Sequence, residues 1–364
     1  MDVVWMRLRR VNRDTKHILY SNMSGELKSV LEDGPIEGEP LVSVCVITYN
    51  HGKYIRQCLD GILMQKVNFP YEILIHDDAS PDDTADIIRE YWEKYSTVIK
   101  PILQTENQHS QGRSASKFNY DRAKAKYIAL CEGDDYWTDD GKLQMQVDFL
   151  EEHGEYVGTA HSVCIVDIDG VPKERVKNWI VYDSDHVFSA ECLNKRWLAG
   201  QTASLVYRNI FQTLSQDILE KYYACKSHGD RKLTVMLASL GEIQCFGNVM
   251  SHYRQVTHTG TSANAQVANK PPAKWQYFME EAICEFARDA FNLTINPSHE
   301  YVRLSAAGIL YFIMHPSAIA LKDVMYVIWN GRVKITGIVA YMLPRMVSEY
   351  PKALFRKIKR EFGT

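Results

Sequence analysis

Three acidic residues follow directly on an apolar run near the middle of the chain. Residues 127–131 form that run, and Glu132, Asp134 and Asp135 come immediately behind it. Carboxylates are rarely buried without a positive partner, so a cation is expected beside them. Mg²⁺ or Mn²⁺ accepts one or two carboxylates together with phosphate oxygens. The structural alternative is helix capping, which residues 138–141 are expected to provide for the next helix.

Two further polar sites stand at the ends of predicted strands. Thr48, Tyr49 and Asn50 close one apolar run, and Asp77 and Asp78 close another. The two aspartates could cap the helix that follows, or a carboxylate could accept the imide N–H of uracil and a ribose hydroxyl. No glycine-rich phosphate loop occurs anywhere in the chain. Any bound phosphate would therefore need a carboxylate-held cation to neutralise it.

Strand and helix alternate through the first half of the chain, and this alternation is what would position the three sites. Apolar runs rich in β-branched residues are followed by turns and then by helical periodicity. The runs occupy residues 41–48, 72–77, 98–103 and 127–131. Short connections of this kind favour a parallel α/β sheet, in which ligands collect beyond the carboxyl ends of the strands. The three sites should face one crevice.

The pattern changes after a helix at residues 142–152. Alternating polarity at residues 157–167 predicts a half-exposed strand, residues 200–208 predict another, and residues 243–254 predict the last strands, which together indicate a mixed sheet. Residues 209–241 hold two helices separated by a turn at 226–230. The expected division is a lead-in and linker at 1–40, a catalytic domain at 41–265 with halves 41–152 and 153–265, and a helical C-terminal region at 266–364.

Composition and charge restrict the class of protein. The 364 residues are 46% hydrophobic and 24% charged, with a formal net charge of −3. This is an ordinary globular composition, too balanced to indicate nucleic acid as the main partner. Eight cysteines without a CxxC pair indicate reduced core cysteines. The N-terminus lacks an apolar signal segment, so a cytoplasmic location is expected.

The C-terminal region raises the question of membrane contact. Residues 304–321 carry no formal charge but are interrupted by His315 and Pro316, so two helices are expected there rather than one spanning helix. From Arg332 onward the chain has eight Lys or Arg and two Glu, a local charge of +6 that leaves −9 for the rest. Such a basic, amphipathic tail could lie on the inner face of the cell membrane, or it could pack on the catalytic domain as a solvated face.

Several stretches together resemble the nucleotide-sugar half of the inverting family 2 glycosyltransferases, which have the GT-A fold, a Rossmann-like mixed α/β sheet flanked by helices. They are VSVCVITYN, EILIHDDAS with Gln65 before it and Asp83 behind it, Gly112 before a helix, AKAKYIALCEGDDYW, and KLQMQVDFLEE. The resemblance covers about 110 residues from 41 to 152. It implies GT-A architecture here, with the C-terminal region as a helical extension.

The resemblance also implies roles for individual residues. Asp77 would contact uracil and Asp78 the ribose. The cation, Mn²⁺ or Mg²⁺, would lie on Asp134 and Asp135, because Glu132 replaces the first Asp of the family's DxD motif and is longer by one methylene. Trp137 would pack against the donor sugar or the acceptor, or would simply cover the sheet edge. The full set of expected nucleotide-sugar contacts is Thr48, Tyr49, Asn50, Asp77, Asp78, Glu132, Gly133, Asp134, Trp137 and Arg254.

A general base is expected from the acceptor half. SHGDRKLTVMLASLGEI resembles the family segment in which an acid opens a helix below the active site, which implies Asp230 as base, with a helix N-cap as the alternative. SHYRQVTHTGTS resembles the loop that closes over the pyrophosphate and implies Arg254 as a diphosphate contact. His258 lies four residues after Arg254 rather than two, so its role and that of His252 stay open.

The function that these residues predict is transfer of a sugar from a nucleoside diphosphate-sugar, expected to be a UDP-sugar. The acceptor would be a glycan or a lipid-linked glycan in cell-envelope polysaccharide assembly. Two alternatives stay open: a nucleotidyltransferase, which would need a glycine-rich phosphate loop, and a non-catalytic nucleotide- or glycan-binding module of the same fold.

Overall fold

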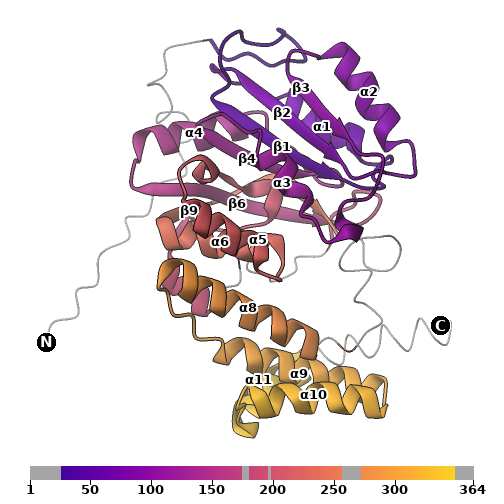
Figure 1. Ribbon diagram of the computed structural model, residues 1–364, viewed down its shortest axis with the longest axis vertical. Coiled ribbons are helices and arrows are strands. Elements are labelled where there is room, and N and C mark those ends of the chain that lie inside the picture. The colour runs from indigo at the N-terminus through magenta and orange to yellow at the C-terminus, as the bar shows by residue number, and fades with distance from the viewer. Residues whose placement is uncertain (1–25, 174–179, 196–197, 256–270, 272, 349–364) are drawn as a thin grey trace, which may run out of the picture.

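A nine-stranded mixed sheet forms the centre of the molecule in the computed structural model, which describes residues 26–173, 180–195, 198–255, 271 and 273–348 (Figure 1). Four strands in the order β3-β2-β1-β4 run parallel. They are β1 (Val42–Thr48), β2 (Tyr71–Asp77), β3 (Ile99–Leu103) and β4 (Tyr127–Glu132). The parallel α/β sheet predicted for this half of the chain is confirmed.

The second half continues the same sheet with reversed directions, in the order β4-β8-β6-β9-β5, and β7 also pairs with β9. Strand β8 is antiparallel to both β4 and β6, whereas β6 and β9 are parallel. The predicted mixed sheet is confirmed. These strands are β5 (Tyr136–Trp137), β6 (Tyr156–Val166), β7 (His186–Phe188), β8 (Val206–Arg208) and β9 (Glu242–Arg254).

Helices cover both faces of the sheet and give each face its own core. One core takes α1 (Ile55–Leu63), α2 (Thr84–Lys94) and α4 (Lys142–Glu152). The other takes α3 (Ala115–Tyr120), α5 (Gln216–Ala224) and α6 (Gly229–Leu240). Neighbouring residues of one strand enter opposite cores, as Val44 and Cys45 of β1 do. This two-sided burial explains why the parallel strands read as continuous apolar runs.

The prediction of a half-exposed strand at residues 157–167 is wrong, because β6 is buried along almost all of its length. Its polar residues are hydrogen-bonded inside the core. Thr159 Oγ1 accepts from Gln146 Nε2 at 3.0 Å and donates to the carbonyl of Val206 at 3.2 Å. His161 Nδ1 lies 2.9 Å from the carbonyl oxygen of Ser162. Alternating polarity therefore reflected an internal hydrogen-bond network and not solvent exposure.

The predicted strand at residues 200–208 is shorter than expected and covers only β8. A 3₁₀ turn at Thr202–Ser204 precedes it, and the side chain of Gln201 accepts from the backbone N–H of Ala203 at 2.7 Å. This capping interaction breaks the strand. At the other end of the domain, residues 243–254 form one long strand, β9, where two or more were expected.

The described part of the predicted linker packs on the catalytic domain. Lys28 and Val67 exchange backbone hydrogen bonds of 2.8 and 3.0 Å, and Val30 enters the core beside α1. Residues 1–25 lie outside the described residues.

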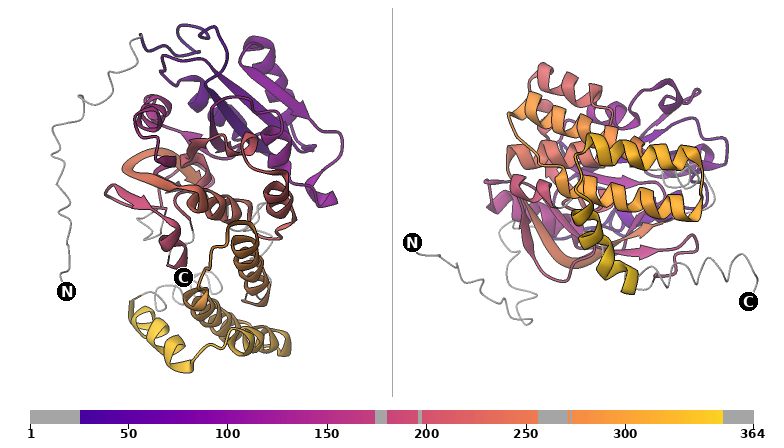
Figure 2. Two further views of the ribbon diagram at one scale, coloured as in Figure 1. Left: turned by 60° about the vertical axis from the view of Figure 1, so that its left-hand side comes forward. Right: turned by 90° about the horizontal axis from the view of Figure 1, so that it is seen from below.

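Among the described residues, four helices follow the sheet: α8 (Ala273–Phe291), α9 (Ser298–Met314), α10 (Ala318–Asn330) and α11 (Ile335–Ser348). Helix α8 packs on α5 and α6, and the layer of α9, α10 and α11 lies beyond it (Figures 1 and 2). The expected break at His315 and Pro316 is confirmed, since it separates α9 from α10. In the part of the chain that the structure describes, every helix falls short of the length or apolarity needed to cross a bilayer.

A buried ion pair joins α6 to α8. Arg231 Nη2 lies 3.0 Å from Glu280 Oε1, and the two side chains are 1% and 5% exposed. Because α6 begins next to the predicted base Asp230, this pair fixes the start of that helix against the C-terminal layer. A buried charge that loses its partner is strongly destabilising.

Glu280→Ala should therefore lower the free energy of unfolding by about 3–5 kcal/mol, because the guanidinium of Arg231 would stay buried without this carboxylate. Urea unfolding monitored by circular dichroism measures the change. Glu90→Ala is the matched control, since Glu90 pairs with Arg56 on the exposed surface and its loss should shift the midpoint little. Equal midpoints for wild type and Glu280→Ala would contradict the structural role of the pair.

Candidate active site

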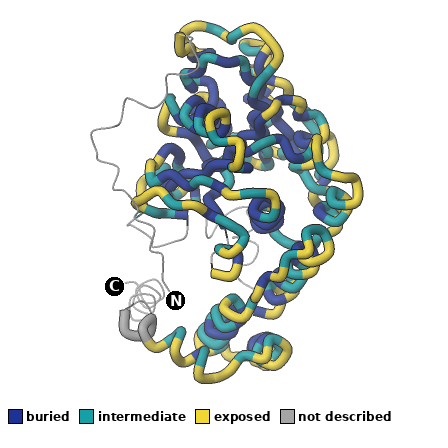
Figure 3. The backbone as a smooth tube through the Cα atoms, turned by 90° about the vertical axis from the view of Figure 1, so that its left-hand side faces the viewer, coloured by how far each residue is buried: buried dark blue, intermediate teal, exposed yellow. Residues whose placement is uncertain are grey.

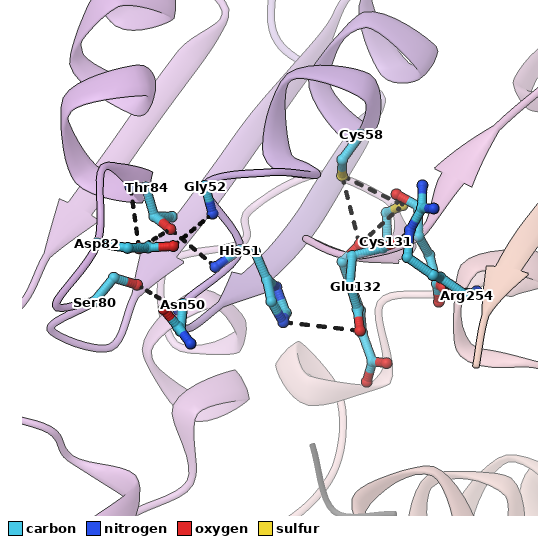
Figure 4. A network of polar contacts seen from close by, with 12 residues as sticks. Asn50, His51, Gly52, Cys58, Ser80, Asp82, Thr84, Cys131, Glu132 and Arg254 are labelled. Carbon is cyan, nitrogen blue, oxygen red and sulfur yellow. Dashed lines mark hydrogen bonds and ion pairs between the residues drawn. The ribbon is translucent and has the colours of Figure 1, made fainter. Parts of the chain in front are cut away.

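The carboxyl ends of β1, β2 and β4 bring the predicted site residues to one edge of the sheet. In the parallel register Thr48 lies beside Asp77, and Ile47 lies beside Glu132. The acidic loop after β4 therefore stands next to the turns after β1 and β2. Figure 4 shows His51, from the turn after β1, and Glu132, at the end of β4, pointing into the same region. The predicted convergence of the three strand ends is confirmed.

Glu132, Asp134 and Asp135 form a compact carboxylate cluster, with ligand atoms that all lie within 4.8 Å of one another. Burial, together with the charges of Asp134 and Asp230, raises the pKa of Glu132 to about 8. Burial and the charges of Asp134 and Glu132 likewise raise the pKa of Asp135. Ionising all three neighbouring carboxyl groups costs free energy because their negative charges repel one another. A divalent cation would relieve that repulsion. Three carboxylates supply the hard oxygen ligands that Mg²⁺ or Mn²⁺ needs, so the residues fit the predicted metal.

Asp135 is the most constrained member of the cluster. Its side chain is 1% exposed, Oδ2 accepts from Gln201 Nε2 at 2.6 Å, and Oδ1 accepts from the backbone N–H of Arg254 at 2.8 Å. These two bonds tie the acidic loop to the turn before β8 and to the end of β9. A cation bound by Asp135, as predicted, would share the two carboxylate oxygens with these two hydrogen-bond donors. Among the described residues, no comparable hydrogen bond reaches the carboxylate of Glu132.

His51 belongs to the site, although the sequence reasoning treated it only as part of a turn. Its Nε2 lies 3.8 Å from Asp134 Oδ2. Its Nδ1 and Thr48 Oγ1 are buried without a hydrogen-bond partner. Unsatisfied buried polar atoms beside a carboxylate cluster are typical of a site that binds a ligand. The position directly after Tyr49 and Asn50 was the available signal, because it extends the predicted strand-end pocket by one residue.

Gly133 allows the acidic loop to approach β1 this closely. A Cβ at this position would lie 2.6 Å from Thr48 Oγ1 and 2.9 Å from His51 Nδ1. Any other residue would push the loop away from the end of β1. Gly133, predicted as a ligand contact, therefore has a packing role that is visible in the structure.

The turns after β1 and β2 hold one another in place. Asn50 and Ala79 both adopt positive φ, at 59° and 61°, which is uncommon for residues other than glycine. The backbone N–H of Asn50 donates to Ser80 Oγ at 2.8 Å (Figure 4). Ser80 in turn donates to Asp77. Asp82 similarly accepts from the backbone N–H of Gly52 at 2.9 Å. This network fixes the backbone around the predicted base pocket.

Asp77 and Asp78 are almost fully buried, at 1% and 3% exposure. The carboxylate of Asp78 accepts from the backbone N–H groups of Gln108 and His109 at 2.7 and 3.0 Å. It thereby holds the loop after β3 against the end of β2. The contacts of Asp77 with uracil and of Asp78 with ribose stay predictions, as does the base-pocket role of Tyr49.

The structure corrects the role predicted for Trp137. Its side chain is 1% exposed, and Nε1 donates to the carbonyl of Ala203 at 2.9 Å. Lys142 Nζ lies 4.0 Å from the ring centroid, inside the same core. The indole therefore packs under α1 and α4 and cannot stack on a sugar. The alternative, a structural residue of the sheet, is the correct one.

Arg254 is likewise not a free cation in the crevice. Its guanidinium donates to the carbonyls of Asp134 and Ile168 at 3.0 Å each and to Gln57 Oε1 at 2.8 Å. It also lies 4.5 Å from the ring centroid of Tyr54 and is 4% exposed. Most of its N–H groups are therefore already engaged, and the diphosphate contact stays a prediction. Arg254 fastens the acidic loop to β9.

Asp230 lies in the first turn of α6, where His228 is the N-cap residue. The alternative of an N-cap role for Asp230 is therefore wrong. Its Oδ1 accepts from the backbone N–H of Arg231 at 2.7 Å, and burial is the main cause that raises its pKa. After burial and the charge of Asp134, the charge of Asp230 is a further cause of the raised pKa of Glu132, so the two carboxyl groups are near enough to interact electrostatically.

The two histidines left open by the sequence differ in outcome. His252 Nδ1 lies 2.7 Å from the hydroxyl of Tyr136, on the paired strands β5 and β9, and burial lowers its pKa. It is a strand residue with a partner. His258 lies outside the described residues.

A well-formed surface hollow lies elsewhere. It has a volume of about 730 Å³ between α3 and α5 and is lined by Tyr120, Phe211 and Tyr223 among others. None of the clustered acids lines it. The chemistry of the carboxylate cluster, and not the size of a hollow, therefore identifies the candidate site.

Sequence comparison finds known proteins that are similar to this chain. The family model described as Glycosyl transferase family 2 matches residues 43–192. An uncharacterized protein of Mycobacterium tuberculosis is 36% identical over 217 residues, which cover 60% of this chain and 59% of that protein. The chain thus matches less than two thirds of that relative. An uncharacterized glycosyltransferase of Nostoc is 25% identical over 66% of this chain and 72% of its own length.

Solved structures support the architecture. Residues 1–349 of TarS from S. aureus, crystallised with UDP-GlcNAc, superpose with a TM-score of 0.55 at 17% identity over 80% of each chain. Identity at this level speaks for the fold alone. Residues 43–192 thus match glycosyltransferase family 2, and the mixed sheet flanked by helices has the GT-A fold.

Proposed function

We propose that this chain is a metal-dependent, inverting glycosyltransferase. It takes a sugar from a nucleoside diphosphate-sugar, a UDP-sugar, and transfers it to a glycan or a lipid-linked glycan in cell-envelope polysaccharide assembly. The observation that carries the proposal is the carboxylate cluster at the end of β4, electrostatically coupled to Asp230 on α6. One half of the domain supplies the cation site and the other supplies a base.

The donor and the context are supported by the comparisons. TarS, which shares the fold, was crystallised with UDP-GlcNAc. A Bacillus subtilis protein provisionally named as a teichuronic acid biosynthesis glycosyltransferase is 33% identical over 138 residues, 38% of this chain and 52% of its own length. In this proposal Thr48, Tyr49, Asn50 and Asp77 line the pocket for uracil and ribose. The enzyme would act in the cytoplasm and meet a lipid-linked acceptor at the inner face of the membrane.

The metal is assigned to the carboxylate cluster. We place Mn²⁺ or Mg²⁺ on Asp134, with Asp135 and Glu132 beside it. When bound, the cation would neutralise the diphosphate leaving group. Asp134 suits this role because its side chain is 17% exposed and, among the described residues, forms an ion pair only with His51. Asp135 would hold the loop in position through its bonds to Gln201 and Arg254.

Asp230 is proposed as the general base. It takes the proton of the acceptor hydroxyl while that oxygen forms a bond to the anomeric carbon. The bond from the anomeric carbon to the diphosphate oxygen breaks on the opposite face, so the configuration inverts. A carboxylate with a pKa raised by burial is a stronger base than an exposed one. The position of Asp230 on a rigid helix, anchored by Arg231 and Glu280, would keep it aimed at the acceptor.

Asp134→Asn should weaken the binding of Mn²⁺ in the presence of UDP about tenfold or more, because one carboxylate ligand is lost. Electron paramagnetic resonance of free Mn²⁺ measures this directly. Asp139→Asn is the control, since Asp139 is exposed and its carboxylate accepts from the backbone N–H of Gly141 in the turn before α4. Equal Mn²⁺ affinity in wild type and Asp134→Asn would remove Asp134 from the metal site.

Asp230→Asn should leave UDP binding unchanged and lower kcat by about 10²–10⁴-fold, because asparagine cannot take the acceptor proton. Binding is followed by calorimetry, and turnover by release of UDP from a UDP-sugar. Asp217→Asn on α5 is the control, as Asp217 pairs with Lys221 at the surface. A normal kcat for Asp230→Asn would exclude it as the base.

The raised pKa of Glu132 predicts a pH effect on the metal-free protein. Folded Glu132 holds a proton up to about pH 8, whereas an exposed glutamate releases it near its ordinary pKa of 4.5. The folded state thus binds the extra proton, so its stability should fall as the pH rises between those values. Glu132→Gln should flatten this decline, which melting curves from about pH 5 to about pH 8.5 would reveal. Parallel curves for both proteins would contradict the pKa shift.

A further inference from the structure

The C-terminal layer exposes large apolar side chains that neither the fold nor the proposed chemistry uses. Trp329 is 81% exposed, Ile335 73%, Ile319 72% and Leu343 61%. These values exceed that of Trp92 on α2, which is 45% exposed. Figure 3 shows exposed residues throughout this layer. Such an apolar surface normally marks an interaction site.

The exposed side chains follow helical spacing. Leu321, Met325 and Trp329 recur every four residues on α10, and Ile335, Val339 and Leu343 recur every four residues on α11. Residues four apart lie on one face of a helix, so each helix presents an apolar stripe.

One face of α10 is already packed against the rest of the protein. Its buried residues Val324 and Val327 point into the contacts of α10 with α8 and α9. The stripe of α10 therefore faces away from the rest of the molecule. Seen from below in Figure 2, the layer of α9, α10 and α11 lies in front of the catalytic domain.

The charged residues around the apolar stripes indicate which kind of partner this surface would bind. Lys322, Arg332 and Lys334 are exposed beside the stripes. Asp323, the acid of α10, already accepts from the backbone N–H groups of Ala273 and Lys274. Residues 313–364 carry nine Lys or Arg and three Asp or Glu, a charge of +6, whereas the preceding 312 residues carry −9. An apolar stripe flanked by cations complements an anionic lipid surface.

We propose that α10 and α11 dock in the plane of an anionic bilayer surface, with Trp329 at the level of the lipid headgroups. Tryptophan suits that depth because it combines a large apolar ring with one polar N–H group. The helices lie on the bilayer, since no described helix is fit to span it. The inference extends the proposed function by assigning the surface through which the enzyme would meet a lipid-linked acceptor.

Flotation of the full chain with vesicles tests the proposal. Wild type should float with phosphatidylglycerol vesicles and much less with phosphatidylcholine vesicles. The double variant Trp329→Ser and Ile335→Ser should lower the bound fraction about tenfold, because both side chains are exposed and their apolar contact is lost. Trp92→Ser, an exposed tryptophan outside the layer, should bind as wild type. All proteins should keep their Mn²⁺-dependent UDP binding, which separates failure of this inference from failure of the proposed function.

Three results would overturn the assignment. The first is absence of wild-type binding to the phosphatidylglycerol vesicles, or equal binding by the double variant. The second is binding that is lost on removal of residues 349–364 but kept by the double variant, which would move the contact to the C-terminal tail. The third is a wild-type dimer in sedimentation that the double variant converts to a monomer, which would make a second copy of the chain the occupant of the stripes.

Discussion

The repulsion among the clustered carboxylates at the end of β4 is the constraint on which the rest of the site depends. Burial, together with the charges of Asp134 and Asp230, raises the pKa of Glu132 to about 8, and the ligand atoms of Glu132, Asp134 and Asp135 lie within 4.8 Å of one another. Without a cation the cluster can persist only if a proton and several hydrogen bonds neutralise part of the charge. A divalent cation with a diphosphate would do the same more completely. The cluster is thereby preorganised for a charged ligand.

The second half of the chain supplies the groups that hold this cluster. Gln201 before β8 and the backbone of Arg254 at the end of β9 both donate to Asp135. The Arg254 side chain crosses to Gln57 on α1, which joins the acidic loop to both halves of the domain. The charge of Asp230 on α6 also acts on Glu132, and the buried pair of Arg231 and Glu280 joins the start of that helix to α8. Helix α8 therefore helps to hold α6 in place.

The sequence predicted the features that local pattern determines. Strands buried on both faces read as continuous apolar runs, and their carboxyl ends identified Thr48, Asp77 and the acidic loop. Burial of the aromatic and cationic residues could not be predicted in this way. Trp137 and Arg254 looked like ligand contacts, yet their partners Ala203 and Gln57 are 66 and 197 residues away. Gln201 was missed for the same reason, because only the folded chain brings it to Asp135. His51 was missed although it directly follows Tyr49 and Asn50 in the sequence.

Calorimetric titration of the purified chain with UDP, GDP, CMP and dTDP, each with Mn²⁺ and with EDTA, tests the central claim most directly. A cation-dependent nucleotide site at the carboxylate cluster predicts that UDP binds with Mn²⁺, that EDTA abolishes the binding, and that the other nucleotides bind more weakly. Binding of none of them, or binding of UDP that is equally strong in EDTA, would contradict it. The cluster would then be a structural feature of the fold and not the centre of a transferase.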